Sequence, residues 1–485
     1  MKTADVIIIG AGGVGCAIAR ELSRYRLDIT VLEKGCDVAG GTSGRNSAVV
    51  HAGFNNRPGS LMAGLCVEGN KGFEALCAQL DVPYKKTGKL IAAFDDEDIA
   101  SLHHLIIQGE TNGCSGLRIV RGEELRSLVP GTDAIAGMYS PETAIFDPFT
   151  YCIALAENAL SNGVRFRLQR EVIKIDAEQD GMFCVRTAAG ETFRSRYLIN
   201  CAGLYAGSIS EMAGGESYRI YPCRGEYFIL DKIAPEILPM PVYPAPKKGI
   251  GGLGVHLTPT MAGNIIIGPS AEYIDDREDY SCSREVMDKL LGEAETLLPA
   301  IDRKYIIGNY AGIRPKLAPP GEGGYRDFVI KEDERQPHLI NLIGIESPGL
   351  TASYPIARRV RDILSQSLEL AEKQDFIPDR KGPVRFRDLS EAEQKALIQK
   401  DPEYGRIICR CQKVTKREIR NAIENPLGAR SISAIKYRAW ATTGRCNGGY
   451  CLSRIVDMLV DEYGMNPAEI TYRDPGSEMF TGNVK

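Results

Sequence analysis

The chain has 485 residues, of which 44% are hydrophobic and 25% are charged, and its 59 basic and 63 acidic side chains leave a net charge of −4. The length predicts two or three domains, and the intermixed charges argue against a nucleic-acid-binding protein. No apolar run reaches the roughly 20 residues of a membrane-spanning helix, and Asp5 and several glycines interrupt the apolar run at the amino terminus. We therefore expect a cytoplasmic protein without a signal peptide or a transmembrane segment.

The first predicted element is an apolar strand over residues 6–9, which leads into a glycine-rich turn. Gly10, Gly12 and Gly15 give this turn the pattern G-x-G-x-x-G, and a helix follows from about Cys16. In dinucleotide-binding folds the three glycines permit, in order, a tight turn, close approach of backbone to a pyrophosphate, and packing of the helix on the strand. The amino terminus of the helix adds N–H groups and a positive dipole end for the phosphates.

A second predicted strand, residues 29–32, ends at Glu33. A carboxylate at this point accepts hydrogen bonds from the ribose hydroxyls of an adenosine group. It argues against NADP as the ligand, because the ribose of NADP carries a negatively charged 2′-phosphate there. A glycine-rich turn alone is a weak signal. A strand, turn, helix, strand and acid in this order predict a Rossmann-like nucleotide-binding domain.

The segment HAGFNNRPGSLMAGLCVEGN, residues 51–70, resembles the FAD-dependent oxidoreductases of the D-amino-acid-oxidase-like superfamily, in the branch that includes L-2-hydroxyglutarate and glycerol-3-phosphate dehydrogenases. The segment GIESPGLTAS, residues 344–353, resembles the same family. The resemblance implies FAD rather than NAD, with the loop over residues 40–47 along the pyrophosphate and under the isoalloxazine ring. The residues that it assigns to FAD are Gly10, Gly12, Gly13, Val14, Gly15, Glu33, Lys34, Thr42, Ser43, Asn46, Ser47, Val172, Ala202, Gly203, Gly344, Ser347, Gly349, Leu350 and Thr351.

The middle of the chain predicts two further regions. Residues 76–144 are predicted to be helices with polar joints, one of which begins at the acidic run 95–98 and carries the surface residues His103 and His104. Residues 218–315 alternate apolar and polar side chains between turns such as Gly251-Gly252, apart from one helix near residues 283–298. This pattern predicts an antiparallel β-sheet domain, inserted between nucleotide-binding segments, that covers the flavin and supplies the substrate pocket.

Four of the 14 cysteines lie together near the carboxyl terminus, as the pairs Cys409/Cys411 and Cys446/Cys451. The other ten are scattered, and we interpret them as small core residues. Four thiolates in one short segment predict a zinc site or an iron–sulfur cluster, because a disulfide is disfavoured in the cytoplasm. Residues 407–462 resemble the bacterioferritin-associated-ferredoxin-like (BFD-like) domain, which implies a [2Fe–2S] cluster.

The sequence thus predicts an α/β (α+β overall) protein with an inserted sheet domain and a small C-terminal iron–sulfur domain. The FAD-binding domain is expected to comprise residues 1–75, 145–217 and 336–370, the last of which ends in a helix to about Leu370. The substrate domain is expected to comprise the helical segment 76–144 and residues 218–335. A charged, proline-containing linker, residues 371–405, leads to the iron–sulfur domain, residues 406–475.

Three basic residues are predicted to do the chemistry. Oxidation of a secondary alcohol requires a base for the hydroxyl proton and a fixed cation for an anionic group of the substrate. We predict that His51 is the base, that His256 orients the substrate or binds the anion, and that Arg314 binds the carboxylate or phosphate with its planar fork. The alternatives are ordinary core or surface histidines and a structural ion pair of Arg314.

These observations predict an FAD-dependent dehydrogenase of a small anionic secondary alcohol, with a 2-hydroxy acid such as L-2-hydroxyglutarate as the favoured substrate. Electrons would pass through the [2Fe–2S] cluster to a partner protein or a quinone-linked subunit, and such a partner would place the protein at a membrane surface. The C-terminal domain favours anaerobic-type glycerol-3-phosphate dehydrogenase as the alternative. Related glycerol-3-phosphate enzymes tend to have a lysine or an apolar residue near the position of His256, which argues against it. Oxidation of an amine or amino acid and a role as an electron-transfer subunit remain further alternatives.

Overall fold

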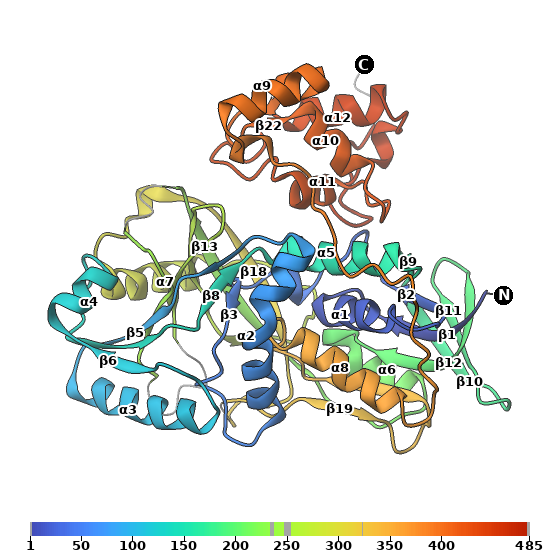
Figure 1. Cartoon of the computed structure of the whole chain (residues 1–485), viewed down its shortest axis with the longest axis horizontal. Coiled ribbons are helices and arrows are strands. Elements are labelled where there is room, and N and C mark those ends of the chain that lie inside the picture. The colour runs from blue at the N-terminus through green and yellow to red at the C-terminus, as the bar shows by residue number, and fades with distance from the viewer. Residues whose placement is uncertain (1, 233–236, 247–253, 323, 483–485) are drawn as a thin grey trace.

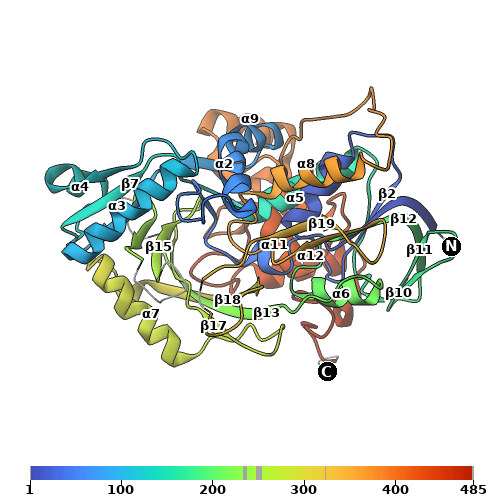
Figure 2. The same cartoon turned by 90° about the horizontal axis from the view of Figure 1, so that it is seen from below.

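A computed structural model describes residues 2–232, 237–246, 254–322 and 324–482 of the chain. Figure 1 shows three parts: a parallel sheet flanked by helices, which contains the amino terminus, a larger sheet beside it, and a small helical domain above both that contains the carboxyl terminus. Figure 2 shows the two sheets side by side from below. No helix among the described residues is long and apolar enough to cross a membrane.

The nucleotide-binding domain is built on five parallel strands in the order β9-β2-β1-β12-β20. Strands β2 and β20 are buried at every position, as expected where helices cover both faces of a parallel sheet. Helices α1, α5 and α8 share the core on one face, and α6 contributes to the core on the other. The bounds are β1 Lys2–Ile9, α1 Gly13–Leu22, β2 Ile29–Leu32, α5 Pro148–Ser161, β9 Arg165–Arg167, β12 Thr192–Asn200, α6 Ala206–Met212, β20 Leu339–Ile343 and α8 Ser353–Leu364. This sheet confirms the predicted Rossmann-like domain.

Smaller elements extend this domain. Strands β10 and β11 pair antiparallel beside β12, β19 pairs antiparallel with β20, and a separate three-stranded sheet has the order β3-β8-β4. Helix α2 packs against α5 and α8. Their bounds are β3 Val49–Val50, α2 Leu61–Leu80, β4 Tyr84–Lys86, β8 Ala144–Phe146, β10 Val172–Ala177, β11 Phe183–Thr187 and β19 Val329–Glu332.

The substrate domain is a nine-stranded sheet. Strand β18 pairs along one edge of β13, β16 and β17 share its other edge, and the order continues β16-β15-β14-β5-β7-β6. Helix α7 covers one face and forms an apolar core with it. The bounds are β5 Lys89–Ala93, β6 Arg118–Val120, β7 Ala136–Ser140, β13 Tyr221–Leu230, β14 Val242–Pro244, β15 His256–Pro259, β16 Ile265–Gly268, β17 Glu272–Tyr273, α7 Arg284–Leu297 and β18 Ile306–Lys316.

One prediction about this domain is wrong and another is confirmed. The segment 76–144, predicted to be helical, supplies the three strands β5, β6 and β7 as well as the helices α3 (Asp96–Thr111) and α4 (Gly122–Leu128). Strands β13 to β18 pair antiparallel with one another, as predicted, and a parallel pairing joins β14 to β5 of the other segment. Strand β5 reads Lys-Leu-Ile-Ala-Ala, a short apolar run that periodicity cannot assign, and its partner β14 lies far along the chain.

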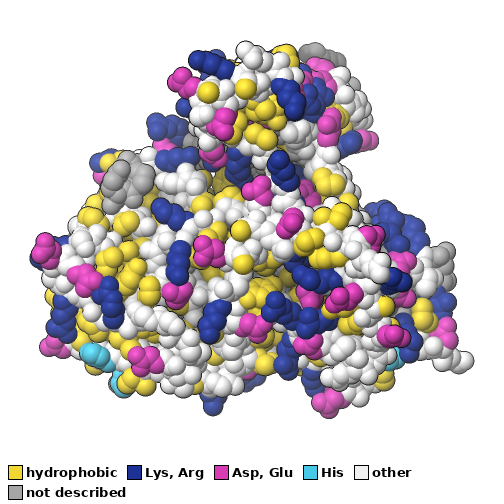
Figure 3. Space-filling model, in the orientation of Figure 1, with side chains coloured by type: hydrophobic (Ala, Val, Ile, Leu, Met, Phe, Trp, Pro, Cys, Tyr) yellow, Lys and Arg dark blue, Asp and Glu magenta, His cyan; other side chains and the backbone are white. Residues whose placement is uncertain are grey.

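Three smaller predictions have different outcomes. His103 and His104 are exposed on α3, as predicted, and histidines lie at the surface in that part of the molecule in Figure 3. The helix expected to reach about Leu370 ends at Leu364. The turn predicted at Gly251-Gly252 lies outside the described residues.

The segment predicted as a linker is attached to the nucleotide-binding domain along much of its length. Arg26 N–H donates to Ala371 O (2.8 Å), and Lys373 N–H donates to Arg24 O (2.7 Å). Arg380 pairs with Glu157 on α5 at 2.7 Å. The remainder contains helix α9 (Glu391–Lys400), which lies with the small helical domain in Figure 1.

The small C-terminal domain has its own apolar core, which the short pair β21 and β22 and three amphipathic helices enclose. A capping box between Thr415 and Glu418 begins α10. The bounds are β21 Ile407–Cys409, β22 Val414–Thr415, α10 Lys416–Ile423, α11 Ile432–Ala439 and α12 Leu452–Asp461. Figure 3 shows that this domain stands out from the rest of the molecule above a constriction.

Candidate functional site

The glycine turn after β1 has almost no room for side chains. Gly10 has φ of +103°, and a Cβ there would lie 2.5 Å from Cys201 O. A Cβ on Gly15 would overlap Gly10 O, and one on Gly13 would overlap the side chain of Leu350. Gly12 is different, since its added Cβ would meet only Ser43 Oγ at 3.2 Å. The backbone at Gly12 is therefore the part of the turn that a ligand can approach.

The Glu33 carboxylate is fixed at the end of β2 by two backbone groups. Ala11 N–H donates to Oε2 and Gly35 N–H donates to Oε1, both at 2.7 Å. Burial raises its pKa, and these two N–H groups oppose the rise. Each oxygen keeps a further lone pair, so the carboxylate remains able to accept from ribose hydroxyls.

The predicted FAD residues gather at one end of the parallel sheet. Gly10, Glu33, Ala202, Gly203 and Gly344 all follow the carboxyl ends of parallel strands, the edge at which ligands of such sheets bind. Val172 is half-buried at the start of β10. Lys34 is engaged elsewhere, in a 2.7 Å ion pair with Glu278 of the substrate domain.

Two helix amino termini meet at the same place. Helices α1 and α8 pack together, and neither has a side-chain hydrogen bond at its N-cap, Gly12 or Ala352. Leu350, in the turn before α8, lies directly against Gly13. At the start of α1 the Gly13 N–H donates to Ser43 Oγ (2.9 Å), in the loop predicted to contact FAD. Two positive helix ends beside this glycine turn fit the negative pyrophosphate and the flavin of FAD.

The loop over residues 42–47 lies across β18 of the substrate sheet. Thr42 Oγ1 donates to Ile313 O (2.7 Å), and Tyr310 Oη donates to Asn46 O (2.9 Å). Position 312 requires glycine where this loop passes, because a Cβ there would overlap Arg45 O. The loop therefore brings the nucleotide-binding edge against one face of the sheet.

The structure brings His51 and His256 together in this region. Ser47 Oγ lies 3.2 Å from His256 Nε2, and Ser347 Oγ lies 3.4 Å from His51 Nε2. His51 N–H also donates to Thr351 Oγ1 (3.1 Å). Residues predicted to touch FAD thus hold both histidines in place.

Both imidazoles are neutral at physiological pH. Burial, and then the charge of Lys89, lower the pKa of His51 to about 3. The same two causes lower the pKa of His256 well below its usual value. A neutral imidazole has a nitrogen lone pair that can accept a proton. Burial makes it a weak base, so a negative charge of the bound substrate must raise its pKa for it to act as the base.

Arg314 joins the site from β18. Its Nη1 and Nη2 atoms donate to Ser270 O at 3.3 and 3.2 Å, and Nη1 lies 3.8 Å from Cys223 Sγ. Among the described residues Arg314 forms no ion pair, whereas nearby Lys316 is paired with buried Glu346 at 3.1 Å. The alternative interpretation of Arg314 as half of a structural ion pair is therefore not supported, and its guanidinium keeps N–H groups for an anion.

Sequence analysis missed two residues of this pocket. Lys89 begins β5 and is only 1% exposed, and Tyr243 on β14 is equally buried. The ring of Tyr243 stacks on His256 with centroids 3.7 Å apart. In the sequence, a lysine that precedes a short apolar run looks the same whether it is buried or exposed. The burial of Lys89 could therefore not be predicted.

The four C-terminal cysteines meet as two pairs. The Sγ atoms of Cys411 and Cys446 are 3.5 Å apart, and Cys409 and Cys451 are hydrogen-bonded to each other. That hydrogen bond lowers the pKa of Cys409 to about 6, which favours a thiolate at neutral pH. Cys409 and Cys451 are buried, while Cys411 and Cys446 are exposed.

The spacing of the paired thiols fits ligands that share a metal ion. Two thiolates on one tetrahedral ion lie about 3.7 Å apart when the metal–sulfur bonds are about 2.3 Å, close to the Cys411–Cys446 separation of 3.5 Å. Two pairs of this kind can supply two ligands to each of two irons, as a [2Fe–2S] cluster requires.

Contacts of the C-terminal domain reach both other domains. Arg438 on α11 forms a buried ion pair with Asp37, with Nη2 2.9 Å from Oδ1. Tyr437 stacks on Phe149 of α5, with centroids 3.8 Å apart. Asn447, beside the predicted ligand Cys446, donates to Ile307 O of the substrate sheet (3.0 Å). The cysteine loop is therefore anchored next to the domain that holds the pocket.

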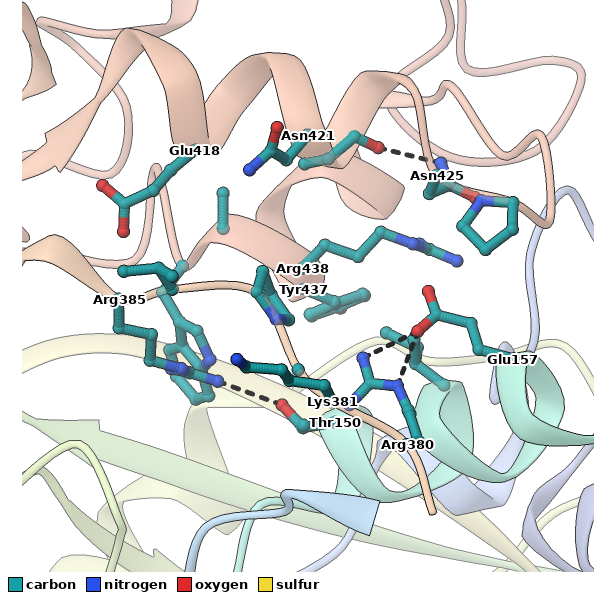
Figure 4. A pocket seen from close by; sticks show the side chains of 18 of the residues that line it. Thr150, Glu157, Arg380, Lys381, Arg385, Glu418, Asn421, Asn425, Tyr437 and Arg438 are labelled. Atoms are coloured by element: carbon teal, nitrogen blue, oxygen red, sulfur yellow. Dashed lines mark hydrogen bonds and ion pairs between the residues drawn. The ribbon is translucent and has the colours of Figure 1, made fainter. Parts of the chain in front are cut away.

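A cavity of about 470 Å³ lies between α5, residues 379–387 and the helices α10 and α11. Figure 4 shows that Arg380 points to Glu157 and Arg385 to Thr150 within it. The basic groups that line it are mostly paired in this way. We therefore interpret the cavity as part of the contact between domains and not as a second active site.

Comparisons with known proteins agree with these features. The model of the family described as FAD dependent oxidoreductase matches residues 5–363, and that of the BFD-like [2Fe-2S] binding domain matches residues 407–461. Glycerol 3-phosphate dehydrogenase of Caloramator mitchellensis is 38% identical over 484 residues, which cover 99% of each chain. The mitochondrial L-2-hydroxyglutarate dehydrogenase of Arabidopsis thaliana is 32% identical and covers 73% of this chain and 82% of its own length.

Among solved structures, L-alpha-glycerophosphate oxidase from Mycoplasma pneumoniae with FAD bound has a TM-score of 0.74 at 29% identity. The alignment covers 79% of this chain and all of the oxidase chain. The part of this chain outside the alignment is about as long as its linker and C-terminal domain together, as expected if the oxidase fold lacks that domain.

Proposed function

Because this chain belongs to the family of FAD-dependent oxidoreductases and carries a BFD-like [2Fe–2S] domain, we propose that it oxidises the secondary alcohol of glycerol 3-phosphate. The observation that carries the proposal is a group of side chains at the flavin edge of the nucleotide domain, where the charge of Arg314 acts on the buried imidazole of His256 and Arg314 forms no ion pair with a described residue. A relative that matches 99% of this chain, and so both domains, is named for glycerol 3-phosphate, which favours this substrate over the 2-hydroxy acid expected from the sequence.

In this proposal His51 accepts the proton of the substrate hydroxyl. Ser347 and Thr351 fix its imidazole and backbone, and burial keeps it neutral until it takes the proton. Arg314 holds the phosphate and His256 orients the substrate, and together they position the carbon that loses hydrogen. When bound, FAD accepts the hydride and the [2Fe–2S] cluster accepts electrons singly.

The residues that would hold FAD are those of the glycine turn, Glu33, the loop over residues 42–47 and the turn before α8. The residues that would hold the cluster are Cys409, Cys411, Cys446 and Cys451. The final electron acceptor is proposed to be a partner protein or a quinone-linked subunit, because two of the four cysteines are exposed at the surface of the C-terminal domain.

L-2-hydroxyglutarate is the second candidate substrate. Several relatives between 30% and 36% identical are L-2-hydroxyglutarate dehydrogenases, and they cover about three quarters of this chain. An amine is disfavoured, because a cationic substrate would be repelled by Arg314 and Lys89.

The experiment is anaerobic bleaching of the flavin in the purified holoenzyme. We expect glycerol 3-phosphate to reduce the flavin faster and at lower concentration than L-2-hydroxyglutarate or a panel of amino acids. Arg314→Lys should raise KM and lower kcat, since it keeps the charge and loses the fork. Bleaching by an amino acid alone would contradict the proposal, and bleaching by none of these compounds would favour an electron-transfer subunit.

A further inference from the structure

Lys89 is a buried lysine to which the described residues offer no acidic partner. It is 1% exposed, and no carboxylate among the described residues forms an ion pair with it or raises its pKa. Two aromatic rings lie beside it, with Nζ 3.8 Å from the ring centroid of Tyr243 and 5.0 Å from that of Phe54. Burial of an unpaired ammonium group is unfavourable, so a buried lysine of this kind needs another reason to be there.

The register of the sheet places Lys89 on the same face as the pocket. Leu90, the next residue of β5, packs with the α7 core, and Val242 and Leu257 pack there too. Successive side chains of a strand point to opposite faces. Lys89, Tyr243 and His256 therefore lie together on the other face, which the loop carrying Ser47 and His51 covers.

Tyr243 connects Lys89 to His256. The imidazole of His256 stacks on one side of the ring at 3.7 Å and 10°, and the ammonium of Lys89 lies over the ring at 3.8 Å. The positive charge of Lys89 also acts on both histidines, where it lowers each pKa. Lys89 is therefore electrostatically part of the site that contains the proposed base.

The Lys89 ammonium group forms no hydrogen bond with the described residues. Its Nζ is also not among the described side-chain atoms that are both fully buried and without a hydrogen-bond partner. An ammonium group whose N–H donors have no acceptor among its described neighbours can donate to an anionic oxygen of a ligand.

We propose that Lys89 binds an anionic oxygen of the substrate, as a cation of the pocket additional to Arg314. The proposal rests on the proposed function, because it takes the same pocket as the substrate site. The ligand chemistry is a phosphate or carboxylate group on a short hydroxylated molecule. Binding supplies the negative partner that Lys89 lacks, and it also reduces the repulsion between Lys89 and a protonated His51.

The test compares Lys89→Met with Lys89→Arg in the oxidised holoenzyme. Inorganic phosphate and glutarate are titrated separately, and each Kd is read from the perturbation of the flavin absorbance. We expect Lys89→Met to weaken binding of the preferred anion about tenfold or more, since it removes a charged hydrogen-bond donor. Lys89→Arg should restore most of the affinity, which a purely structural role in packing would not predict.

Lys85→Met is the matched control, because Lys85 is exposed on the neighbouring strand β4. An unchanged Kd in Lys89→Met, an equal change in the control, or binding of neither anion by the wild type would overturn the proposal. The proposed function fails in a different way, if the wild type binds the anion but neither glycerol 3-phosphate nor L-2-hydroxyglutarate reduces its flavin. Phosphate binding without glutarate binding would identify the preferred group as a phosphate.

Discussion

His51 and His256 occupy one pocket but have different surroundings. His51 follows the flavin loop, and its Nε2 faces Ser347 in the turn before α8. His256 stands on the substrate sheet, where its Nδ1 lies 3.2 Å from Gly254 O and its ring is stacked on Tyr243. A ring held on both nitrogens and one face is suited to orient a substrate. The ring of His51 has fewer contacts and is the better proton acceptor.

We predict that His51→Ala slows anaerobic flavin reduction by about 10²–10⁴-fold. Substrate binding should change much less, and higher pH should restore part of the rate because hydroxide can replace the lost base. The measurement is the limiting rate of flavin bleaching at saturating substrate. His103→Ala, at the surface of α3, is the control.

His256→Ala should instead raise the substrate concentration needed for half-maximal reduction. If His256→Ala abolishes reduction and His51→Ala does not, the two roles must be exchanged. If both variants reduce the flavin at the wild-type rate, the base is another residue.

Lys89 also leads to a prediction about stability. Burial lowers its pKa from the usual 10.5 to about 7. The Lys89 amine therefore binds a proton more weakly in the folded chain than in the unfolded chain, which lowers the free energy of unfolding. This cost to folding is absent above about pH 10.5, grows as the pH falls, and is complete below about pH 7. Lys89→Met removes it and leaves a side chain of similar length that suits the aromatic surroundings.

We therefore expect Lys89→Met to be more stable than the wild type in phosphate-free buffer, by about 5 kcal/mol at most. The difference should be larger at pH 7 than at pH 9.5. Thermal unfolding at the two pH values measures it. A difference that does not depend on pH would show that Lys89 does not titrate as the structure indicates.

For single residues, sequence analysis proposed site residues that belong to recognisable motifs. It missed residues whose only distinguishing feature is that the fold buries them beside the site. Cys409 and Cys446 stand in spacings typical of metal ligands, and His51 adjoins a glycine-rich loop. Lys89 has no such neighbour in sequence, because its partners Tyr243 and His256 come from strands that the fold brings beside it.

The element that organises the nucleotide site is the unit β1, turn and α1. Within the turn, glycine is required at different positions for different reasons. Position 15 requires glycine because the carbonyl oxygen of Gly10 occupies the space that a Cβ would take. Gly12 has space for a Cβ beside Ser43, so its lack of a side chain serves the ligand rather than the fold.

This contrast predicts two different losses. Gly12→Val should fold normally but lose FAD, because the branched side chain fills the space that the pyrophosphate takes. Gly15→Val should destabilise the domain itself, since its helix can no longer pack on the strand. Flavin content and thermal unfolding of the apoproteins separate the two outcomes. Full FAD occupancy in Gly12→Val would contradict the assignment of this turn.

Helices and strands whose start and end signals lie within the same short segment could be predicted from the sequence. Strands that depend on pairing with residues far along the chain could not. Strands β1 and β2 carry their glycine turn and acid with them, and α10 carries its capping box. Strand β5 is a five-residue run whose neighbours β7 and β14 lie on either side of it. Nothing within that run distinguishes a strand from a buried helix segment.

At the scale of the whole molecule, the C-terminal domain helps to close the nucleotide site. Cys36 N–H donates to Asp474 Oδ1 (2.8 Å), and Arg473 donates to Gly40 O. Cys36 and Gly40 belong to the loop that follows Glu33. Residues near the carboxyl terminus therefore hold a loop that the FAD adenosine is expected to contact.

We predict that Arg473→Ala and Asp474→Ala release FAD faster, by about fivefold for each hydrogen bond lost at about 1 kcal/mol. The measurement is the rise of flavin fluorescence after dilution of the holoenzyme. Glu469→Gln, exposed in the same segment, is the control. Release rates equal to the control would show that the loop holds FAD without help from this segment.

The last prediction concerns the division of labour between the two redox sites. The four cysteines lie in a domain with its own core, so loss of the cluster should not disturb the pocket on the substrate sheet. Cys446→Ser should remove most of the iron, about two atoms per chain in the wild type, and leave anaerobic bleaching of the flavin by substrate unchanged. Transfer to an external acceptor should slow, because electrons must then leave the flavin directly. Cys282→Ser is the control outside the cluster, and it should alter neither iron content nor transfer. If Cys446→Ser stops the bleaching itself, the cysteine loop anchored by Asn447 to Ile307 supports the pocket as well as the cluster, and the two sites are not separable.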